Sequence, residues 1–319
     1  MQKTTSRLIF LLMIVVLVNA CGKNEQEPVQ KKITVEAEAD TFKFANLEEI
    51  RLYFRANDFS TDTWAAGDRS VPRFYLVSVP SRWRHEVAPN LPPEKKKQYF
   101  FFVYTPLVLR SNESIMLDRQ KLVGLAAQAT RSPEDDSWLR DLASRYFMET
   151  DPVEPLPDGL IEELLLRVDV VPPGLALAQA AVESGWSTSR FTDVGNALFG
   201  QWTWGADGIT PSQQRDNMGD YKIKAFDSPD QSIAAYMRNL NTHRSYRAFR
   251  QERARLRAAG KTPDGKTLAK SLTSYSEKGQ EYVNTLQSVI KVNHLEQMDK
   301  TFLRDMKPVM LVPVGEGSD

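Results

Sequence analysis

The sequence predicts an α+β fold that is mostly helical and carries a small β lobe. Apolar residues recur at helical spacing through most of the chain after about residue 112, and capping residues mark where several of these segments begin. One stretch, residues 195–226, is instead rich in glycine and tryptophan, which suits a loop with a small β-hairpin. No internal repeat is visible, so the chain is not a solenoid.

The composition limits the classes of partner. The chain has 319 residues, enough for one large domain or two modest ones. Its 41 basic and 41 acidic residues give a formal net charge of +0, so we expect no nucleic-acid partner. The hydrophobic fraction of 41% is ordinary for a globular protein.

Residues 1–20 have the layout of a secretory signal peptide. Lys3 and Arg7 precede an apolar run, 8–18, that is too short to span a bilayer comfortably. The order Val-Asn-Ala-Cys then resembles a bacterial lipobox, with cleavage before Cys21 and lipid on its sulfur. An ordinary signal peptide followed by a chance cysteine is the alternative. Because Cys21 is the only cysteine, the exported chain forms no internal disulfide.

The residue after the cysteine is Gly22, so the aspartate that would suggest inner-membrane retention is not there. By resemblance to such lipoproteins, this is compatible with the outer membrane. We therefore expect a periplasm-facing lipoprotein of the cell envelope, held to the membrane by the lipid on Cys21. Residues 21–42 are polar and charged and suit a flexible tether. Residues 43–99 form an extension of uncertain structure.

Two segments near the extension read as strands or extended chain, residues 70–80 and 98–105. Prolines follow one another closely between residues 72 and 93, which makes a regular sheet doubtful. The sequence therefore predicts extended structure here without a defined sheet.

The predicted helices then follow in order. The first covers residues 115–129, and the second begins at the cap Ser132 with a proline in its first turn. Asp158 is the expected cap of a third helix, and Pro172-Pro173 ends that helix and begins the next.

Three more helices are expected beyond the β-hairpin. Ser228-Pro229-Asp230-Gln231 reads as a capping box with a first-turn proline. Residues 250–258 are basic and amphipathic, and Gly260 ends that helix. We interpret its arginines as a solvated face, with contact to anionic cell wall or lipid as the alternative. The last helix begins near Gln280, and the tail after Lys307 is expected to be irregular.

One acid stands out in the helix that begins at Pro173. Glu183 lies in its last turn, just before Gly185, after an almost wholly apolar run. The partial negative charge of a helix C-terminus and partial burial both disfavour the anion, so both raise the pKa. A raised pKa is what a general acid needs at neutral pH. The structural alternative is an ion pair, with Arg190 as the nearest partner in sequence.

Aromatic and amide side chains follow this acid closely. Flat aromatic rings stack on the apolar faces of sugars, and neutral amides hydrogen-bond their hydroxyl groups. The alternative is that the rings fill a core, but four glycines between residues 195 and 208 favour loops that expose them. The pattern indicates a glycosidase cleft whose candidate substrate-binding residues are Trp186, Asn196, Phe199, Gln201, Trp202 and Trp204.

The motifs AQAAVESGW and GNALFGQW together resemble the signature of the bacterial glucosaminidase family of peptidoglycan hydrolases, in its Bax-like branch. The segments AFDSPDQSIAAYMRNL and LTSYSEKGQEYVNTLQSVIKVN are similar to later parts of that family's pattern. The resemblance covers residues 100–297 and leaves 298–319 as a tail. It implies a lysozyme-like fold and hydrolysis of the β-1,4 bond after N-acetylglucosamine in peptidoglycan, with no cofactor.

Carried over position by position, the resemblance makes Glu183 the catalytic acid. Tyr282 matches a tyrosine thought to assist by stabilising charge or by positioning water or the acetamido group. Tyr275 matches a groove tyrosine that precedes it. Asn196 and Phe199 match positions of the family's N-x-L-F-G motif.

The sequence departs from the family at the second carboxylate. Many members have a T-x-E glutamate on the β-hairpin, but this chain has no glutamate between Glu183 and Glu252. An inverting mechanism needs a base ~6.5–9.5 Å from the acid, leaving room for water. Either Asp207, Asp216 or Asp220 supplies that base, or the substrate's own 2-acetamido oxygen attacks, which we favour slightly.

Two other functions stay open. A lytic transglycosylase also uses one acid in an E-S motif but cleaves after N-acetylmuramic acid and leaves a 1,6-anhydro ring. A non-catalytic peptidoglycan-binding lipoprotein is the second alternative. His85, His243 and His294 are scattered without metal-ligand spacing, so we expect surface or cap roles and no metal site. Nothing in the sequence identifies a protein partner.

Overall fold

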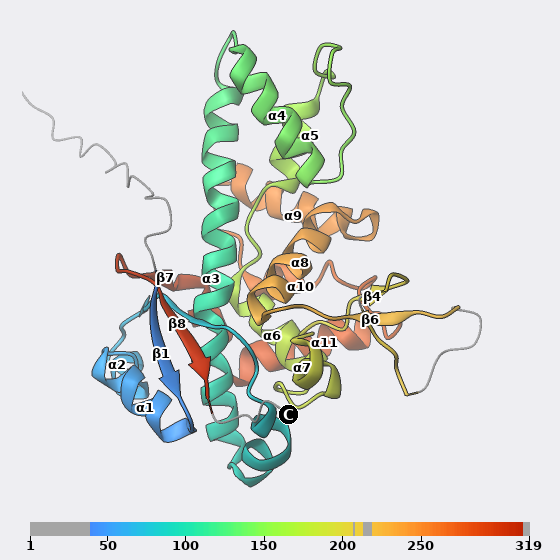
Figure 1. Cartoon of the computed structure of the whole chain (residues 1–319). Coiled ribbons are helices and arrows are strands. Elements are labelled where there is room, and N and C mark those ends of the chain that lie inside the picture. The colour runs from blue at the N-terminus through green and yellow to red at the C-terminus, as the bar shows by residue number, and fades with distance from the viewer. Residues whose placement is uncertain (1–38, 207, 213–218, 315–319) are drawn as a thin grey trace, which may run out of the picture. The chain divides into compact units, whose positions relative to one another are not determined.

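A long helix, α3 (Pro93–Ala126), packs against several of the other helices and two of the strands of the computed structural model (Figure 1). The structure describes residues 39–206, 208–212 and 219–314. The predicted signal peptide and Cys21 lie outside the described residues. The prediction of a strand at 98–105 is wrong, because this apolar run is part of α3. Phe100, Tyr104 and Leu107 are buried at helical spacing, a pattern that a short apolar run cannot distinguish from a strand.

The first and the last of the described strands pair in one small parallel sheet. β1 (Asp40–Phe44) and β3 (Phe74–Leu76) both pair in parallel with β8 (Val309–Pro313), which lies between them. A second parallel pair joins β2 (Ser70–Val71) to β7 (Phe302–Leu303). The expectation of an irregular tail after residue 307 is therefore wrong for β8.

The segment between these strands packs into the main core. α1 (Leu47–Ala56), α2 (Thr61–Ala65), η1 (Trp83–Val87) and η2 (Ala88–Asn90) follow in order. Ile50, Phe54 and Phe74 are buried in the same apolar cluster as Leu175 and Tyr282. Burying each large apolar side chain contributes about 1.5–3 kcal/mol. The residues expected to form an extension of uncertain structure thus contribute directly to the core.

The far end of α3 packs with a helical pair. α4 (Pro133–Arg145) and α5 (Leu160–Arg167) enclose a second apolar cluster that includes Leu122, Leu142 and Leu164. Ser132 caps α4, and its hydroxyl accepts a hydrogen bond from Asp135 N, as predicted. Asp158 does not cap α5, because Gly159, with φ 77°, occupies the N-cap position.

The helix that carries the candidate acid is α6 (Pro173–Ser184), and it begins at the predicted proline. It packs against α3, α10 (Gly265–Ala269), α11 (Gln280–Val292) and η4 (Leu295–Lys300), so most of its residues are buried. Backbones approach closely at its start, where a Cβ added to Gly174 would lie 2.3 Å from the carbonyl oxygen of Leu295. Apolar burial on nearly every side explains why its sequence is almost wholly apolar.

The basic segment belongs to α9 (Arg247–Ala258), which follows α8 (Pro229–Thr242) and η3 (Arg244–Tyr246). Ser228 caps α8 as predicted, accepting from Gln231 N. The expectation that the α9 arginines form a solvated face is wrong for Arg250 and Arg253, which are buried. Arg253 donates to the carbonyl oxygens of residues 166, 169 and 170, because a buried guanidinium needs its N–H groups satisfied.

The small β lobe follows α6. α7 (Arg190–Gly195) leads into the antiparallel sheet of β4 (Trp202–Thr203), β6 (Lys222–Lys224) and β5 (Gly208–Ile209). This confirms the predicted hairpin region and, with the helices, the mostly helical α+β class. In the described part of the chain, no helix is long and apolar enough to cross a membrane.

Candidate active site

Glu183 is the penultimate residue of α6, where Gly185 ends the helix in a left-handed conformation with φ 58°. Burial raises the pKa of the Glu183 carboxyl, and a hydrogen bond from Tyr282 opposes part of that rise. Among the described residues, Glu183 has no ion-pair partner. Arg190 instead donates to the carbonyl oxygen of Thr210 at 3.2 Å. The ion-pair alternative is therefore not what the structure contains.

A chain of hydrogen bonds ends on this carboxyl. The Tyr282 hydroxyl donates to Glu183 Oε1 at 2.8 Å and accepts from Gln179 Nε2 at 3.0 Å. The Tyr236 hydroxyl donates to Gln179 Oε1 at 2.6 Å. Gln179 and Glu183 are four residues apart, which places both on one face of α6. Three helices, α6, α8 and α11, thus meet through these four side chains.

Two further tyrosine rings, those of Tyr275 and Tyr246, lie beside this series of hydrogen bonds. Tyr275 stacks on Tyr282 with ring centroids 5.3 Å apart and an interplanar angle of 5°. Tyr246 lies next to Tyr275 at 5.7 Å. Burial, and then the charge of Glu183, raise the pKa of Tyr282. The Tyr282 hydroxyl therefore keeps its proton and remains available as a donor.

The backbone directly after the acid is strained. Gly185, Trp186 and Ser187 have φ values of 58°, 61° and 63°. For a residue with a Cβ, the left-handed conformation costs roughly 1–2 kcal/mol. Ser184 holds this turn from within, because its hydroxyl accepts from Ser187 N at 2.9 Å and donates to the carbonyl of Ala180 at 2.6 Å.

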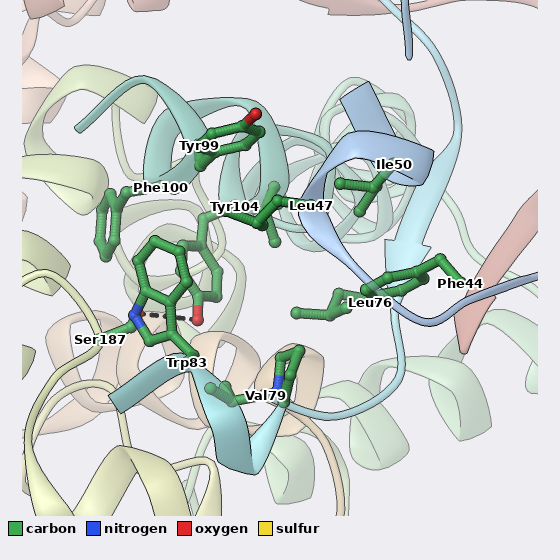
Figure 2. A pocket seen from close by; sticks show the side chains of 12 residues that line it. Phe44, Leu47, Ile50, Leu76, Val79, Trp83, Tyr99, Phe100, Tyr104 and Ser187 are labelled. Atoms are coloured by element: carbon green, nitrogen blue, oxygen red, sulfur yellow. Dashed lines mark hydrogen bonds between the residues drawn. The ribbon is translucent and has the colours of Figure 1, made fainter. Parts of the chain in front are cut away.

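Two aromatic residues from the N-terminal part of the chain hold the same turn from outside (Figure 2). The Ser187 hydroxyl donates to the Tyr104 hydroxyl at 2.8 Å, and Trp83 Nε1 donates to the carbonyl oxygen of Trp186 at 3.3 Å. Sequence reasoning missed both residues, which lie 83 and 103 positions from their partners. The aromatic run around Tyr104 is the available signal, and the sequence interpretation assigns it to a strand or extended chain.

Beside this contact lies an apolar pocket of about 50 Å³. Its lining comes from β1, α1, β3, η1 and α3, and it includes Phe44, Leu76, Trp83 and Tyr104 (Figure 2). Ser187 of the strained turn is also among its lining residues. The pocket shows that the packing behind the turn is not complete.

Several predicted substrate-binding residues are engaged inside the protein. The Asn196 amide accepts from Val79 N and donates to the carbonyl of Phe226, both at 3.0 Å. Phe199 is 4% exposed and stacks face to face on Tyr236 at 3.8 Å. These contacts support the site from within the protein, and binding of substrate by Asn196 and Phe199 stays a prediction.

Trp186 is half-buried and packs edge-on against two phenylalanines. Its ring centroid lies 5.4 Å from that of Phe100 and 5.5 Å from that of Phe101. The Lys97 ammonium lies 5.7 Å from the centre of the same ring. Trp186 therefore fixes the strained turn onto the start of α3.

The β lobe presents the exposed aromatic surface that the sequence predicts. Trp202 is 37% exposed and Trp204 66% exposed, with their rings 6.4 Å apart and nearly perpendicular. Tyr221 lies 4.7 Å from Trp202. The Gln201 Oε1 atom is buried and has no hydrogen-bond partner among the described residues, so a ligand donor would satisfy it.

The structure describes one of the three candidates for a second carboxylate. Asp220 is exposed, and Asp207 and Asp216 lie outside the described residues. The groups hydrogen-bonded in the chain at Glu183 are neutral: two tyrosine hydroxyls and one amide. The arrangement can therefore hold a proton on Glu183 and stabilise the anion that remains after the proton leaves.

The histidines have structural roles. His243 Nδ1 accepts from Ser245 N at the start of η3, and His85 lies 3.3 Å from Asp193. His294 lies 3.7 Å from Glu296. In the described part of the chain, no group of three metal-ligating side chains is close enough to hold an ion.

Comparison with known proteins gives matches in sequence and in structure. Residues 160–295 match the model of the glucosaminidase family, described as mannosyl-glycoprotein endo-beta-N-acetylglucosaminidase. The chain is 32% identical to Protein bax of Escherichia coli (strain K12) over 202 residues, which cover 62% of this chain and 70% of that protein. It also aligns with the crystal structure of the catalytic domain of the autolysin Auto from Listeria monocytogenes. That alignment has a TM-score of 0.33 and 17% identity, and it covers 57% of this chain and 97% of that one.

Proposed function

Because this chain belongs to the glucosaminidase family of glycoside hydrolases, we propose that it is an endo-β-N-acetylglucosaminidase. It hydrolyses the β-1,4 bond after N-acetylglucosamine in the glycan strands of peptidoglycan. One observation carries this proposal: the half-buried carboxyl of Glu183, at a helix end, accepts a hydrogen bond from Tyr282 within the residues that match the family.

Glu183 is the general acid. Burial raises its pKa, so the carboxyl holds a proton closer to neutral pH than an exposed glutamate does. It gives this proton to the glycosidic oxygen as the bond to the anomeric carbon breaks, and the next sugar leaves with a free hydroxyl. Glu183 is then an anion at a helix C-terminus, and the hydrogen bond from Tyr282 stabilises that charge.

The anomeric carbon also needs a nucleophile. In the substrate-assisted version, the oxygen of the 2-acetamido group attacks it, and water then opens the resulting ring. The neutral groups around Glu183 support this version. In the alternative version, Asp207, Asp216 or Asp220 activates a water molecule.

Three asparagine substitutions separate these versions. Asp216→Asn, Asp207→Asn and Asp220→Asn are each assayed for turnover, with circular dichroism as the control for folding. Substrate assistance predicts that each variant keeps most of its activity. Loss of turnover in one folded variant would identify that aspartate as the base.

The β lobe supplies the binding surface. Trp202 and Trp204 offer exposed ring faces to the apolar faces of the sugars. Gln201 Oε1, which has no partner in the described part of the chain, accepts a hydrogen bond from a sugar hydroxyl or acetamido N–H. This combination suits the neutral hydroxyl and acetamido groups of N-acetylglucosamine.

The decisive experiment identifies the new end of the cleaved glycan. Residues 22–319 are incubated with purified sacculi, and the products are identified by mass spectrometry. We expect reducing-end N-acetylglucosamine, and we expect Glu183→Gln to abolish its release. Glu162→Gln, which changes an exposed glutamate on α5, is the matched control and keeps full activity.

Other results of this experiment would identify a different function. A 1,6-anhydro ring on N-acetylmuramic acid would identify a lytic transglycosylase. Binding to sacculi without turnover, unchanged by Glu183→Gln, would identify a non-catalytic peptidoglycan-binding protein.

We also propose that the chain is a lipoprotein of the cell envelope, anchored through Cys21 and facing the periplasm. This proposal rests on the lipobox-like order Val-Asn-Ala-Cys after a short apolar run. Labelled palmitate should be incorporated into the full chain and not into Cys21→Ser. Fractionation of the labelled protein then distinguishes the outer from the inner membrane.

A further inference from the structure

We infer that Gln179 and Tyr236 set the direction of the hydrogen-bond chain at Glu183, so that Tyr282 is always the donor to Oε1 and the acidic proton resides on Oε2. Gln179 and Tyr236 are positioning residues, since they act on the acid only through Tyr282. The inference rests on the proposed role of Glu183 as the general acid.

The direction of donation is set at Tyr236, the buried end of the hydrogen-bond chain. The Tyr236 side chain is 1% exposed, and its hydroxyl proton points to Gln179 Oε1 at 2.6 Å. Among the described residues, this amide oxygen is its acceptor, and an unused donor in a buried position is unfavourable. The oxygen of the Gln179 amide is therefore directed to Tyr236, and its NH₂ group to Tyr282.

The amide then determines what Tyr282 does. The Tyr282 oxygen accepts from Gln179 Nε2, so its own proton is directed to Glu183 Oε1. Since Oε1 accepts this proton, the proton of the neutral carboxyl is on Oε2. An acidic proton on Oε2 is not donated to Tyr282, so it remains available for transfer to substrate.

The reverse direction is the unproductive alternative. Glu183 would donate to Tyr282, Tyr282 to Gln179 Oε1, and the amide NH₂ group to Tyr236. The acidic proton would then be held inside the protein, and the Tyr236 proton would lose its acceptor in the described part of the chain. Desolvation of that buried hydroxyl disfavours the reverse arrangement.

Ring stacking keeps the hydroxyl groups in place. Tyr236 stacks on Phe199 at 3.8 Å and Tyr282 on Tyr275 at 5.3 Å, both nearly parallel. These contacts fix the ring planes, so the hydroxyl groups cannot move to other acceptors without repacking the core. They also assign a physical role to Phe199, which the sequence motif had marked without explaining.

Two substitutions test the direction while preserving shape. Gln179→Met keeps a side chain of similar length and adds no charge, but it removes both the donor and the acceptor of the amide, so Tyr282 is free to accept the Glu183 proton instead of donating to Oε1. Tyr236→Phe keeps the stacked ring but removes the hydroxyl, so the Gln179 amide is free to rotate and exchange the positions of its oxygen and its NH₂ group. For both variants we expect kcat to fall about tenfold, as the loss of one hydrogen bond to a charged group predicts. We expect KM to stay unchanged and the alkaline limb of the pH–kcat profile to move to higher pH.

The same substitutions in a Tyr282→Phe background complete the test. If Gln179 and Tyr236 act through Tyr282, neither moves the alkaline limb further once that hydroxyl is gone. A second shift of equal size in that background would overturn the inference. So would a loss of kcat in the single variants with the limb unmoved, because that is the result of structural damage alone. Tyr146→Phe, which removes a buried hydroxyl from the cluster around α4 and α5, is the control that moves neither quantity.

A titration separates this inference from the proposed function. ¹³C NMR of the glutamate-labelled protein follows the Glu183 carboxyl without turnover, and Glu183→Gln identifies its signal. If the wild-type protein cleaves no glycan, the proposed function fails, and the titration still decides the inference. We expect the pKa of Glu183 to rise in Gln179→Met and Tyr236→Phe and to be unaltered in Tyr146→Phe. An unaltered Glu183 titration in the first two variants would contradict the inference.

Discussion

The Tyr282 hydroxyl donates to Glu183 Oε1 over 2.8 Å, joining α11 to the last turn of α6 across 99 positions of sequence. A donor to this oxygen stabilises the carboxylate more than the neutral acid, so it lowers the pKa of Glu183, while burial raises it. The two opposing effects leave the pKa raised overall. The pH dependence of activity should therefore respond to Tyr282 in a definite direction.

Tyr282→Phe should reduce kcat about 10- to 100-fold, because a hydrogen bond to a charged group contributes about 1.5–3 kcal/mol. Removing the donor raises the pKa of Glu183. A general acid works only when protonated, so the alkaline limb of the pH–kcat profile should move to higher pH. The profile is measured on soluble peptidoglycan fragments. A limb that moves to lower pH would show that Tyr282 does not donate to the carboxylate.

Trp83→Phe and Tyr104→Phe should weaken the strained turn after Glu183. Each removes one hydrogen bond to that turn, worth about 0.5–1.5 kcal/mol, and the tryptophan substitution also enlarges the apolar pocket beside it. We expect lower stability in urea for both and a larger loss for Trp83→Phe.

The turn also positions the acid, so kcat should fall in the same variants while KM changes little. Trp64→Phe in α2 is the control for the loss of a tryptophan remote from the turn. If Trp64→Phe reduced kcat as much as Trp83→Phe, the turn would not be the cause.

Trp202→Ala and Trp204→Ala should weaken binding to glycan strands. Each ring can cover about 50 Å² of a sugar face, which at roughly 25 cal/mol per Å² is near a tenfold change in affinity. Calorimetry with Glu183→Gln protein measures this without turnover. Trp138→Ala on α4 is the matched control. Equal losses of affinity in all three variants would show that the β lobe is not the binding surface.

Gly174→Ala should destabilise the fold strongly. Its Cβ would lie 2.3 Å from the carbonyl oxygen of Leu295, so α6 or η4 must shift. Overpacking of this kind costs typically 1–3 kcal/mol. Gly124→Ala near the end of α3 is the matched control, because nothing lies within 4 Å of its added Cβ. That change should stabilise the protein by roughly 0.5–1 kcal/mol. Chemical unfolding of both variants is the measurement, and equal effects would contradict the close contact at Gly174.

Local rules were sufficient where a feature depends on a few neighbouring residues. Pro173 marks the start of α6, and Gly185 ends it with φ 58°, so these two residues by themselves put Glu183 at a helix end. Ser132 and Ser228 were identified as caps for the same reason. Capping and backbone preference act within one turn of helix, and sequence records them directly.

Local rules failed where packing decides between two conformations. The run at 98–105 suits a strand or a buried helix, and its place between α1, α6 and α8 makes it part of α3. The tail after Lys307 offers few local signals, and β8 forms because β1 and β3 provide partners on both sides.

The sequence by itself determined the mostly helical fold, the helix that ends in Glu183 and the aromatic β lobe. Only the tertiary structure decided what surrounds the acid. Gln179 and Tyr236 lie 57 positions apart, and Trp83 and Trp186 lie 103 apart. Contacts over such separations have no local signature, because their energy comes from the packing of whole helices and not from the preferences of neighbouring residues.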